Sequence, residues 1–157
     1  MTFLVPRNTP KSTTKCGLYS FSGYILKPGG LVGKYYTNKW FSGEKPYLTQ
    51  IDATINMNWG SGDVIPNVAK DYVSIIWEGF LEASYDEDFT FYVESNDGVR
   101  VIVNEKVVID KLQDSENDLD THLEISSTHL PLIAGQLVPI TVMYYETTGI
   151  AMIALYW

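Results

Sequence analysis

Phe89-Thr90-Phe91-Tyr92-Val93-Glu94-Ser95 is joined to Val99-Arg100-Val101-Ile102-Val103-Asn104 by the polar tripeptide Asn96-Asp97-Gly98. Both runs are rich in aromatic and β-branched residues, which favour strands. Asp-Gly between two such runs is a strong hairpin signal, because glycine tolerates positive φ angles. The tripeptide is therefore predicted to be either a tight turn or a small polar site held by two strands.

The rest of the chain repeats this pattern of short strand-like runs separated by turn signals. No segment sustains a 3.6-residue apolar period, so no helix is predicted. The pattern favours an all-β fold, an antiparallel, jelly-roll-like β-sandwich. In the run from 73 to 81, apolar residues alternate and place Trp77 on a buried face. The predicted strands are Leu31–Tyr36, Tyr47–Met57, Tyr72–Leu81, Phe89–Ser95, Val99–Val103, Val107–Lys111, Leu137–Glu146 and Ile150–Trp157.

The start of the chain differs in composition from the remainder. Prolines and glycines are interspersed there with serine and threonine, a mixture that disfavours regular structure. Residues 1–29 are predicted to form an irregular N-terminal arm with one short strand at Leu18–Leu26, and residues 30–157 to form the β-sandwich domain. If this arm docks the protein in an assembly, deletion of residues 1–28 is expected to leave a folded domain that no longer assembles.

Charge and composition narrow the range of partners. The formal net charge is -8 and the pI is about 4.6. The sequence contains no run of Lys and Arg that could bind along a phosphate backbone, so nucleic acid is not an expected partner. No apolar stretch approaches the ~20 residues of a spanning helix, so membrane insertion is not expected. Cys16 is the only cysteine, which excludes an intramolecular disulfide. The first residues lack the pattern of a signal peptide.

Five motifs occur in an order that is typical of one family. They are Gly30-Leu31-Val32-Gly33-Lys34-Tyr35-Tyr36, Asp52-Ala53-Thr54-Ile55-Asn56-Met57-Asn58-Trp59-Gly60, Ile76-Trp77-Glu78-Gly79-Phe80-Leu81, Ser95-Asn96-Asp97-Gly98-Val99-Arg100-Val101 and Leu155-Tyr156-Trp157. Together they resemble the protective-antigen N-terminal domain family, the "PA fourteen" β-sandwich of bacterial toxins, glycosidase-associated modules and yeast flocculin-type adhesins. The resemblance covers residues 30–157.

The resemblance implies a non-catalytic module that, in its lectin-like members, binds glycans through a calcium ion. Those members hold the ion with two consecutive aspartates joined by a cis peptide bond and with an asparagine from a later loop, and sugar hydroxyls complete the coordination shell. Here the dyad position reads Asn96-Asp97, and Thr147 stands where the asparagine would be. The resemblance therefore implies Asp97 and Asn96 as metal ligands, and it implies a place outside the cell or at the cell surface.

Further residues complete the predicted ligand site. Glu146 offers a carboxylate that would restore the charge lost in the dyad, and calcium affinity rises with carboxylate count. Thr147 and Thr148 would supply further oxygens and touch the sugar. Trp40 lies in loop-like surroundings and is the candidate for an exposed ring that stacks on a sugar. A plain turn at the tripeptide, with no metal or ligand, stays open as the alternative.

Other candidate sites fail on spacing. The acidic loop Gln113–Asp120 lacks the glycine at the sixth position and the carboxylate at the twelfth that an EF-hand loop requires. His122 and His129 match neither a metalloprotease helix nor a nucleophile elbow. The spacing of Asp86 and Asp88 does not show the facing acid and base that a glycosidase needs. The protein is therefore expected not to be an enzyme.

Two functions from different classes follow from the sequence. The first is a carbohydrate-binding module for glycan recognition or adhesion, assisted by calcium. The second is a structural or assembly protein that uses the β-sandwich as a protein-protein interaction brick. In that case residues 1–28 would dock the module, because a strand-like start can add to a neighbouring sheet edge. The partner is accordingly expected to be a glycan or a protein.

Overall fold

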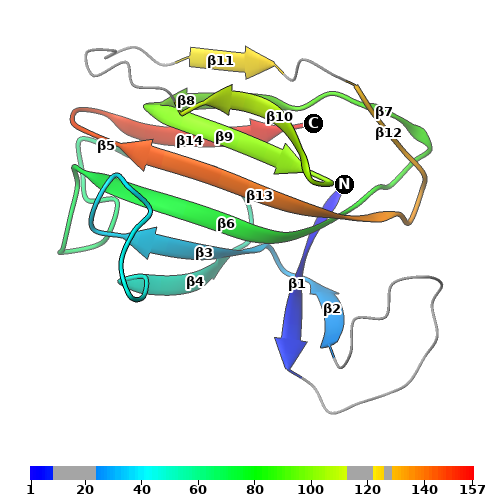
Figure 1. The fold of residues 1–157 in the computed structure, drawn as a ribbon, viewed down its shortest axis with the longest axis horizontal. Coiled ribbons are helices and arrows are strands. Elements are labelled where there is room, and N and C mark those ends of the chain that lie inside the picture. The colour runs from blue at the N-terminus through cyan, green and yellow to red at the C-terminus, as the bar shows by residue number, and fades with distance from the viewer. Residues whose placement is uncertain (9–23, 113–121, 126–128) are drawn as a thin grey trace.

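The structure, a computed structural model, is an antiparallel β-sandwich (Figure 1). It describes residues 1–8, 24–112, 122–125 and 129–157. These residues contain no helix, and so none long and apolar enough to cross a membrane. The predicted all-β class is confirmed. The strands are β1 (Thr2–Asn8), β2 (Tyr24–Pro28), β3 (Leu31–Tyr36), β4 (Leu48–Asp52), β5 (Asn56–Gly60), β6 (Val73–Glu82), β7 (Glu87–Phe89), β8 (Tyr92–Asn96), β9 (Gly98–Val103), β10 (Lys106–Lys111), β11 (His122–Ile125), β12 (Leu130–Leu132), β13 (Leu137–Glu146) and β14 (Ala151–Tyr156).

The larger sheet is built around β6 and β13, which pair antiparallel from Val73 opposite Glu146 to Glu82 opposite Leu137. Beyond β13 lie β9 and then β10. Beyond β6 lie β3 and β4 along its first half and β1 and β2 at its end. Buried residues alternate along much of both long strands, because successive side chains of a strand point to opposite faces.

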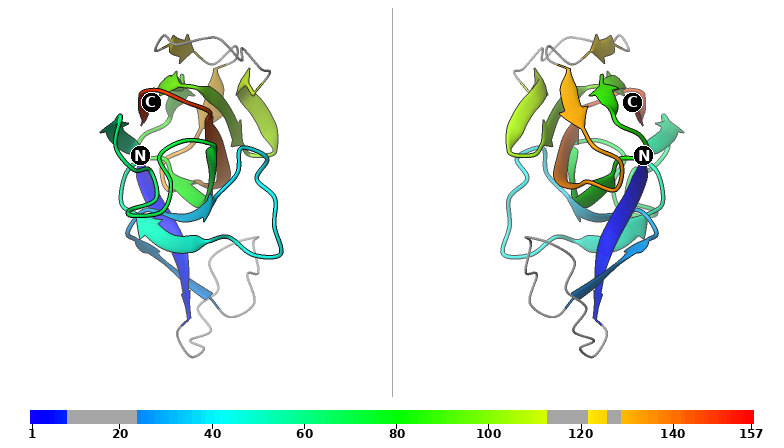
Figure 2. Two further views of the ribbon diagram at one scale, coloured as in Figure 1. Left: turned by 90° about the vertical axis from the view of Figure 1, so that its left-hand side faces the viewer. Right: turned by 90° about the vertical axis from the view of Figure 1, so that its right-hand side faces the viewer.

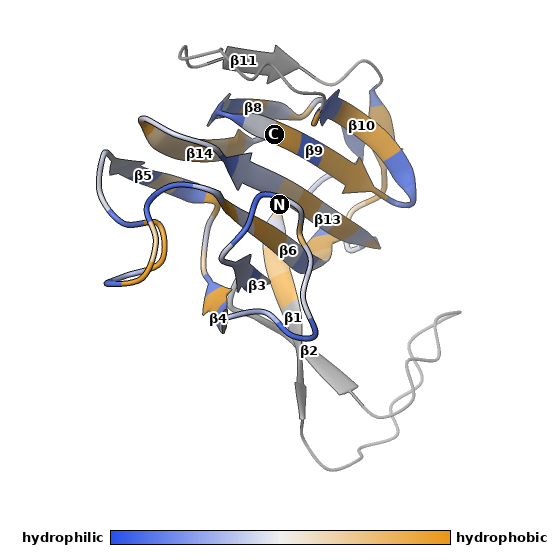
Figure 3. Cartoon of the chain, turned by 60° about the vertical axis from the view of Figure 1, so that its left-hand side comes forward, coloured by the Kyte–Doolittle hydropathy of each residue, from blue (hydrophilic) through white to orange (hydrophobic). Residues whose placement is uncertain are grey.

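The smaller sheet faces the larger one and encloses the core. Its strand order is β11-β8-β14-β5, and β7 and β12 form a separate pair. Figure 2 shows the layers from the two ends of the molecule. In Figure 3 the central strands β6, β13 and β14 are coloured hydrophobic along much of their length, whereas the loops are largely hydrophilic. Trp77, Phe91, Tyr144 and Ile153 are fully buried between the layers, so the predicted core position of Trp77 is confirmed.

One carboxylate is buried at the end of β4. Asp52 accepts hydrogen bonds at Oδ2 from the Tyr35 hydroxyl and the Trp77 indole N–H, both at 2.7 Å, and at Oδ1 from the Gln50 amide at 2.7 Å. Burial and the neighbouring Asp52 raise the pKa of Tyr35, so its hydroxyl remains a donor. Gly33 makes room for this cluster, since a Cβ there would lie 2.4 Å from Asp52 Oδ2. Both oxygens of the carboxylate therefore have donors, which offsets the cost of its burial.

Of the two alternatives at the tripeptide, the tight hairpin turn that the Asp-Gly signal favours is not formed. β8 pairs with β11 and β14 in the smaller sheet, whereas β9 pairs with β10 and β13 in the larger one. Asn96-Asp97-Gly98 thus carries the chain from one sheet to the other. Gly98 does not have a positive φ. It allows a close approach instead, because a Cβ on it would lie 2.1 Å from Cε1 of Tyr145.

The N-terminal segment begins in the sandwich and leaves it as a two-stranded ribbon. The first three residues of β1 pair with the end of β6, Phe3 and Leu4 are buried, and the Phe3 ring lies 5.0 Å from the Trp157 ring, edge to face. Beyond Leu4, which pairs with Pro28, β1 pairs only with β2. This ribbon projects from the sandwich (Figures 1 and 2). The first four residues therefore belong to the folded unit, and the projecting part of the arm starts after them.

Most of the predicted strands are confirmed, two of them, Leu31–Tyr36 and Leu137–Glu146, residue for residue. The predicted run Tyr47–Met57 is divided between β4 and β5. The strands β1, β11 and β12 are absent from the prediction, and β7 overlaps the predicted run Phe89–Ser95 only at Phe89. Residues 18–23 of the predicted Leu18–Leu26 strand lie outside the described residues, and so does the acidic loop Gln113–Asp120.

Candidate functional site

The candidate residues come together at one end of the sandwich. β13 ends at Glu146, and β9 begins at Gly98, directly after Asp97. Tyr145 lies opposite Gly98 in the register of these two neighbouring strands. The loop after β13 therefore meets the crossing between β8 and β9. Figure 1 shows this end of the molecule on the left, where β6 and β14 also begin.

Asp97 fastens the loop that follows β13. Its Oδ2 accepts a hydrogen bond from the backbone N–H of Thr147 at 2.7 Å and a second one from the Thr147 hydroxyl. The peptide bond between Asn96 and Asp97 is cis, as the resemblance implies for the dyad. Thr148 is the next residue of the loop and is exposed. Two residues that lie 50 positions apart in the sequence are thus in direct contact.

Tyr144 connects Asn96 with Glu146. Its hydroxyl donates to the Asn96 carbonyl at 2.5 Å and lies 3.2 Å from Oε2 of Glu146. All three residues are buried. Burial, together with the charge of Glu146, raises the pKa of Tyr144, so the hydroxyl remains protonated. Sequence reasoning missed Tyr144 because it occupies one of the alternating apolar positions of β13, as Val142 does.

Glu146 is a buried carboxyl group with little to compensate a charge. Its side chain is 0% exposed, and its Oε1 has no hydrogen-bond partner among the described residues. Burial raises the pKa of Glu146 to about 8, and the negative charges of Asp97 and Asp71 contribute to the shift. A carboxyl group in such surroundings holds either a proton or a nearby cation.

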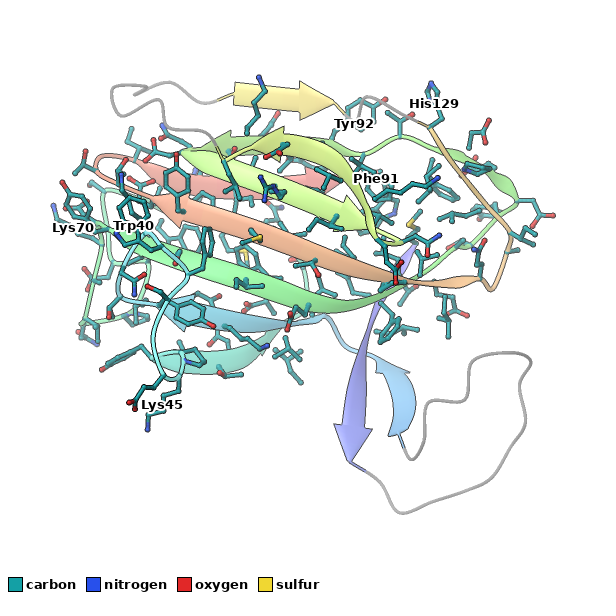
Figure 4. The ribbon with its side chains drawn as sticks, in the orientation of Figure 1. Trp40, Lys45, Lys70, Phe91, Tyr92 and His129 are labelled. Atoms are coloured by element: carbon teal, nitrogen blue, oxygen red, sulfur yellow. The ribbon has the colours of Figure 1, made fainter. Side chains whose placement is uncertain are left out.

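Trp40 lies at the same end of the sandwich, on the loop after β3 (Figure 4), and is 64% exposed. The Asn38 side chain shapes this loop, because its Oδ1 accepts from the Trp40 N–H at 2.9 Å and its Nδ2 donates to the Ser42 carbonyl at 2.7 Å. The N–H of Phe41 donates to the Ser74 hydroxyl at 3.0 Å and joins the loop to β6. The predicted exposure of Trp40 is confirmed, and its contact with a ligand stays a prediction.

Tyr72 also belongs to this end, although the sequence did not single it out. The N–H of Tyr72 donates to the Thr147 carbonyl at 2.9 Å. The Tyr72 side chain is 56% exposed, and its backbone has a φ of 52°. In the sequence Tyr72 reads as the first residue of a strand, so no local signal distinguishes it from the residues that follow. The conformation places it instead on the rim beside the loop after β13.

The oxygens at this end are of the kind that a hard divalent cation prefers. Calcium prefers six to eight oxygen ligands. The described residues contain no group of three or more His, Cys, Asp or Glu that could hold a metal ion. The protein ligands would therefore be the carboxylates of Asp97 and Glu146, with amide and main-chain oxygens such as those of Asn96. The observation that favours the fit is Oε1 of Glu146, buried without a partner among the described residues, since a cation would offset its charge and that of Asp97.

Comparison with known proteins identifies the family. The family model described as "PA14 domain" matches residues 26–157. The chain belongs to the PA14 domain family. The match confirms the resemblance inferred from the five sequence motifs and begins four residues before the first of them, at the ribbon strand β2.

Proteins similar to this PA14 domain include proteins described as anti-sigma factors and a domain from an adhesin. The anti-sigma-I factor RsgI3 of Acetivibrio thermocellus is 34% identical over 128 residues, which cover 82% of this chain and 19% of RsgI3. A solved anti-sigma factor domain-containing protein has a TM-score of 0.72 at 32% identity, covering 81% of this chain and 41% of that one. A PA14 sugar-binding domain from an RTX adhesin has a TM-score of 0.61 at 19% identity, covering 81% and 88%, which shows the shared fold. The chain thus spans about a fifth of the curated relative.

Proposed function

We propose that this PA14 domain is a non-catalytic binding module that recognises a glycan with the help of a calcium ion and serves in adhesion outside the cell or at its surface. The observation that carries the proposal is the Asp97–Glu146 pair. One carboxyl group of the pair is fully buried, has an oxygen without a partner among the described residues, and is repelled by the other. A bound cation would offset both charges.

Each residue of the site has a distinct role in this proposal. Asp97 would be the principal anionic ligand of the ion, with Asn96 and Glu146 adding oxygens. Thr147, held by Asp97 through two hydrogen bonds, and Thr148 would present the loop to the sugar. Calcium would supply a charge that attracts sugar hydroxyls, while the chain fixes the positions of the loops around it.

The relatives support a binding role. The RTX adhesin domain, which is described as sugar-binding, shares the fold. The relatives with higher identity are described as anti-sigma factors or as proteins that contain an anti-sigma factor domain. Both of those proteins are longer than this chain, which is consistent with a module that holds a partner for a larger protein.

Calorimetric titration of calcium into the chelator-treated protein tests the proposal. Saturable binding that the Asp97→Ala variant loses is the expected result. Asp88→Ala is the matched control, because Asp88 is an exposed carboxylate on β7, outside the site. It should bind calcium as the unmodified protein does. Absence of binding in the unmodified protein would refute the calcium site, and equal loss in both variants would show that the binding is not at Asp97.

The projecting ribbon favours a second candidate function, assembly with another protein chain. After Leu4, strand β1 has β2 on one side and no strand on the other in the described residues. Backbone groups of an edge that has no partner strand among the described residues can pair with a further strand. This arrangement matches an assembly role in which residues 1–28 dock the module on a neighbour, which we propose to be a second copy of the chain.

Sedimentation velocity over a range of concentrations tests the assembly role. The informative variant replaces residues 5–27 with an Asn-Gly turn, because Leu4 and Pro28 are direct partners and a two-residue turn suits the joining of paired strands. This variant keeps Phe3 and Leu4 in the core. Concentration-dependent association of the full chain, lost in the variant, is expected. A full chain that is monomeric throughout would reject self-assembly through the ribbon.

A further inference from the structure

Four neighbouring strands of the larger sheet each have one end beside the candidate site, and the residues at these ends lie opposite one another in a row across the sheet. Tyr36 of β3 lies opposite Ser74 of β6, Ser74 opposite Tyr145 of β13, and Tyr145 opposite Gly98 of β9. Since neighbouring strands are ~4.8 Å apart, the three spacings from β9 to β3 amount to roughly 14 Å. Asp97 stands at one end of this row, and the loop that carries exposed aromatic residues stands at the other.

Tyr72 and Trp40 lie one after the other along this row, beyond the loop that Asp97 holds. Tyr72 precedes β6 and is joined to Thr147 through its N–H. Trp40 follows β3, and its loop is joined to Ser74, the second residue of β6, through the N–H of Phe41. Going from β9 to β3, the order is therefore Asp97, the loop after β13, Tyr72 and the Trp40 loop.

Both aromatic side chains are unusually exposed for their size. Trp40 is 64% and Tyr72 is 56% exposed, although large aromatic side chains are mostly buried. Positive φ angles at Phe41 and Tyr72, 55° and 52°, show that the backbone adopts a conformation that bulky residues rarely take. Such conformations concentrate at functional sites because the surrounding structure has to maintain them. Here the hydrogen bonds to Ser74 and Thr147 do so.

We propose that the ligand is an oligosaccharide of at least three linked sugar units, and that Tyr72 and Trp40 bind its successive units as stacking platforms. This inference rests on the proposed glycan-binding function. One pyranose ring is about as wide as one strand spacing, so a single sugar at Asp97 and Thr147 cannot also reach the Trp40 loop three strands away. A chain of linked units that follows the row of strand ends contacts all of these residues. Flat aromatic rings suit the apolar C–H faces of such units.

The first experiment compares ligand lengths at saturating calcium. The probe is a glycan array that presents each of many sugar types as one, two, three and four linked units. Affinity that rises up to three or more units for the sugar that binds is the expected result. Equal affinity for one unit and for the longer chains overturns the inference while leaving the glycan-binding function intact. Absence of binding to every glycan rejects the proposed function, and the inference falls with it.

The second experiment tests whether Tyr72 and Trp40 cause the rise in affinity with ligand length. Tyr72→Ala and Trp40→Ala should each weaken binding of the longest ligand by about three- to tenfold, the range expected of an aromatic contact, and weaken binding of the single sugar by less. Tyr72→Phe retains the ring and should retain affinity. Tyr85→Ala is the matched control, because Tyr85 is 70% exposed but follows the opposite end of β6. Equal losses for short and long ligands, or none, would overturn the assignment.

Discussion

Two carboxyl groups are buried among the described residues, Asp52 and Glu146, and they differ in what surrounds them. Asp52 accepts hydrogen bonds from Tyr35, Trp77 and Gln50 on its two oxygens. Glu146 has only the Tyr144 hydroxyl at 3.2 Å on one oxygen, and no partner among the described residues on the other. Donors make the first group part of the framework. The second lacks them and is suited to hold an ion or a proton.

The pH dependence of stability gives the largest expected effect. The pKa of Glu146 is about 8 in the folded protein, against 4.5 as its ordinary value. Between these values the folded protein retains a proton that the unfolded chain has released, so each rise in pH favours unfolding. At ~1.4 kcal/mol for each pKa unit, the calcium-free protein should lose about 4 kcal/mol of stability from pH 5 to pH 9. Urea denaturation in the presence of a chelator measures this loss.

Glu146→Gln is the control for the pH effect. Glutamine has nearly the same shape but does not ionise, so the contribution of residue 146 should disappear and the pH profile should flatten. At pH 5 the variant and the unmodified protein should be almost equally stable, because Glu146 is then neutral. Parallel profiles from pH 5 to pH 9 would show that Glu146 ionises normally, and the contrast with Asp52 would fail.

Removal of the framework carboxylate should be the next largest effect. Asp52→Ala leaves the Tyr35 hydroxyl and the Trp77 indole N–H buried without their acceptor, and each such group costs about 1 to 3 kcal/mol. We expect the free energy of unfolding to fall by about 3 kcal/mol at every pH between 5 and 9. Urea denaturation followed by tryptophan fluorescence is the measurement. A loss below about 1 kcal/mol would mean that the donors find other partners.

Tyr144→Phe should lower the free energy of unfolding by less, and it tests whether the Tyr144 hydroxyl interacts with Glu146. The substitution removes the donor to the Asn96 carbonyl and the one described hydrogen-bond contact of Glu146. The expected loss of stability is about 1 to 2 kcal/mol. Because the ionised form of Glu146 loses its donor, the pKa of Glu146 should rise further, which NMR titration of the side-chain carboxyl carbon would detect. An unchanged pKa would show that the hydroxyl serves Asn96 alone.

Gln50→Ala is expected to give the smallest change. Gln50 donates to Asp52 at 2.7 Å, but its side chain is exposed and water replaces the lost donor. A loss of about 0.5 kcal/mol is expected, measured by the same denaturation experiment as for Asp52→Ala. A loss as large as that of Asp52→Ala would mean that Gln50 is essential to the cluster, and that the framework carboxylate depends on a surface residue.

The sequence predicts the long strands well but not the path between the sheets. Alternation in 73–82 and 137–146 reports burial directly, because each strand is half-covered by the core. The hairpin prediction failed at Asn96-Asp97-Gly98 because the flanking runs look the same whether they pair with each other or with distant strands. β8 and β9 pair instead with β14 and β13, about 40 to 60 residues further on, and a local pattern carries no information about that choice.

The candidate site was predicted in part. The family resemblance indicated Asn96, Asp97 and Thr147, and the structure brings them together. Tyr144 was missed because its polar atom sits on a residue that the alternation marks as core. β1 was not predicted because Pro6 is unfavourable inside a strand that is paired on both sides. In the structure β1 pairs with β6 only as far as Leu4, so Pro6 has no partner on that side. A proline is tolerated where a strand edge has no partner to receive its missing N–H.

The contact between Phe3 and Trp157 bears on how the module presents itself when it is part of a larger architecture. The first and last strands of the fold meet there, with ring centroids 5.0 Å apart, and Figure 1 shows the two chain ends away from the end that carries Asp97. A tether attached at either end of the chain would therefore leave from the same region. Whichever end is anchored, the loops around Asp97 therefore lie away from the point of attachment and stay accessible.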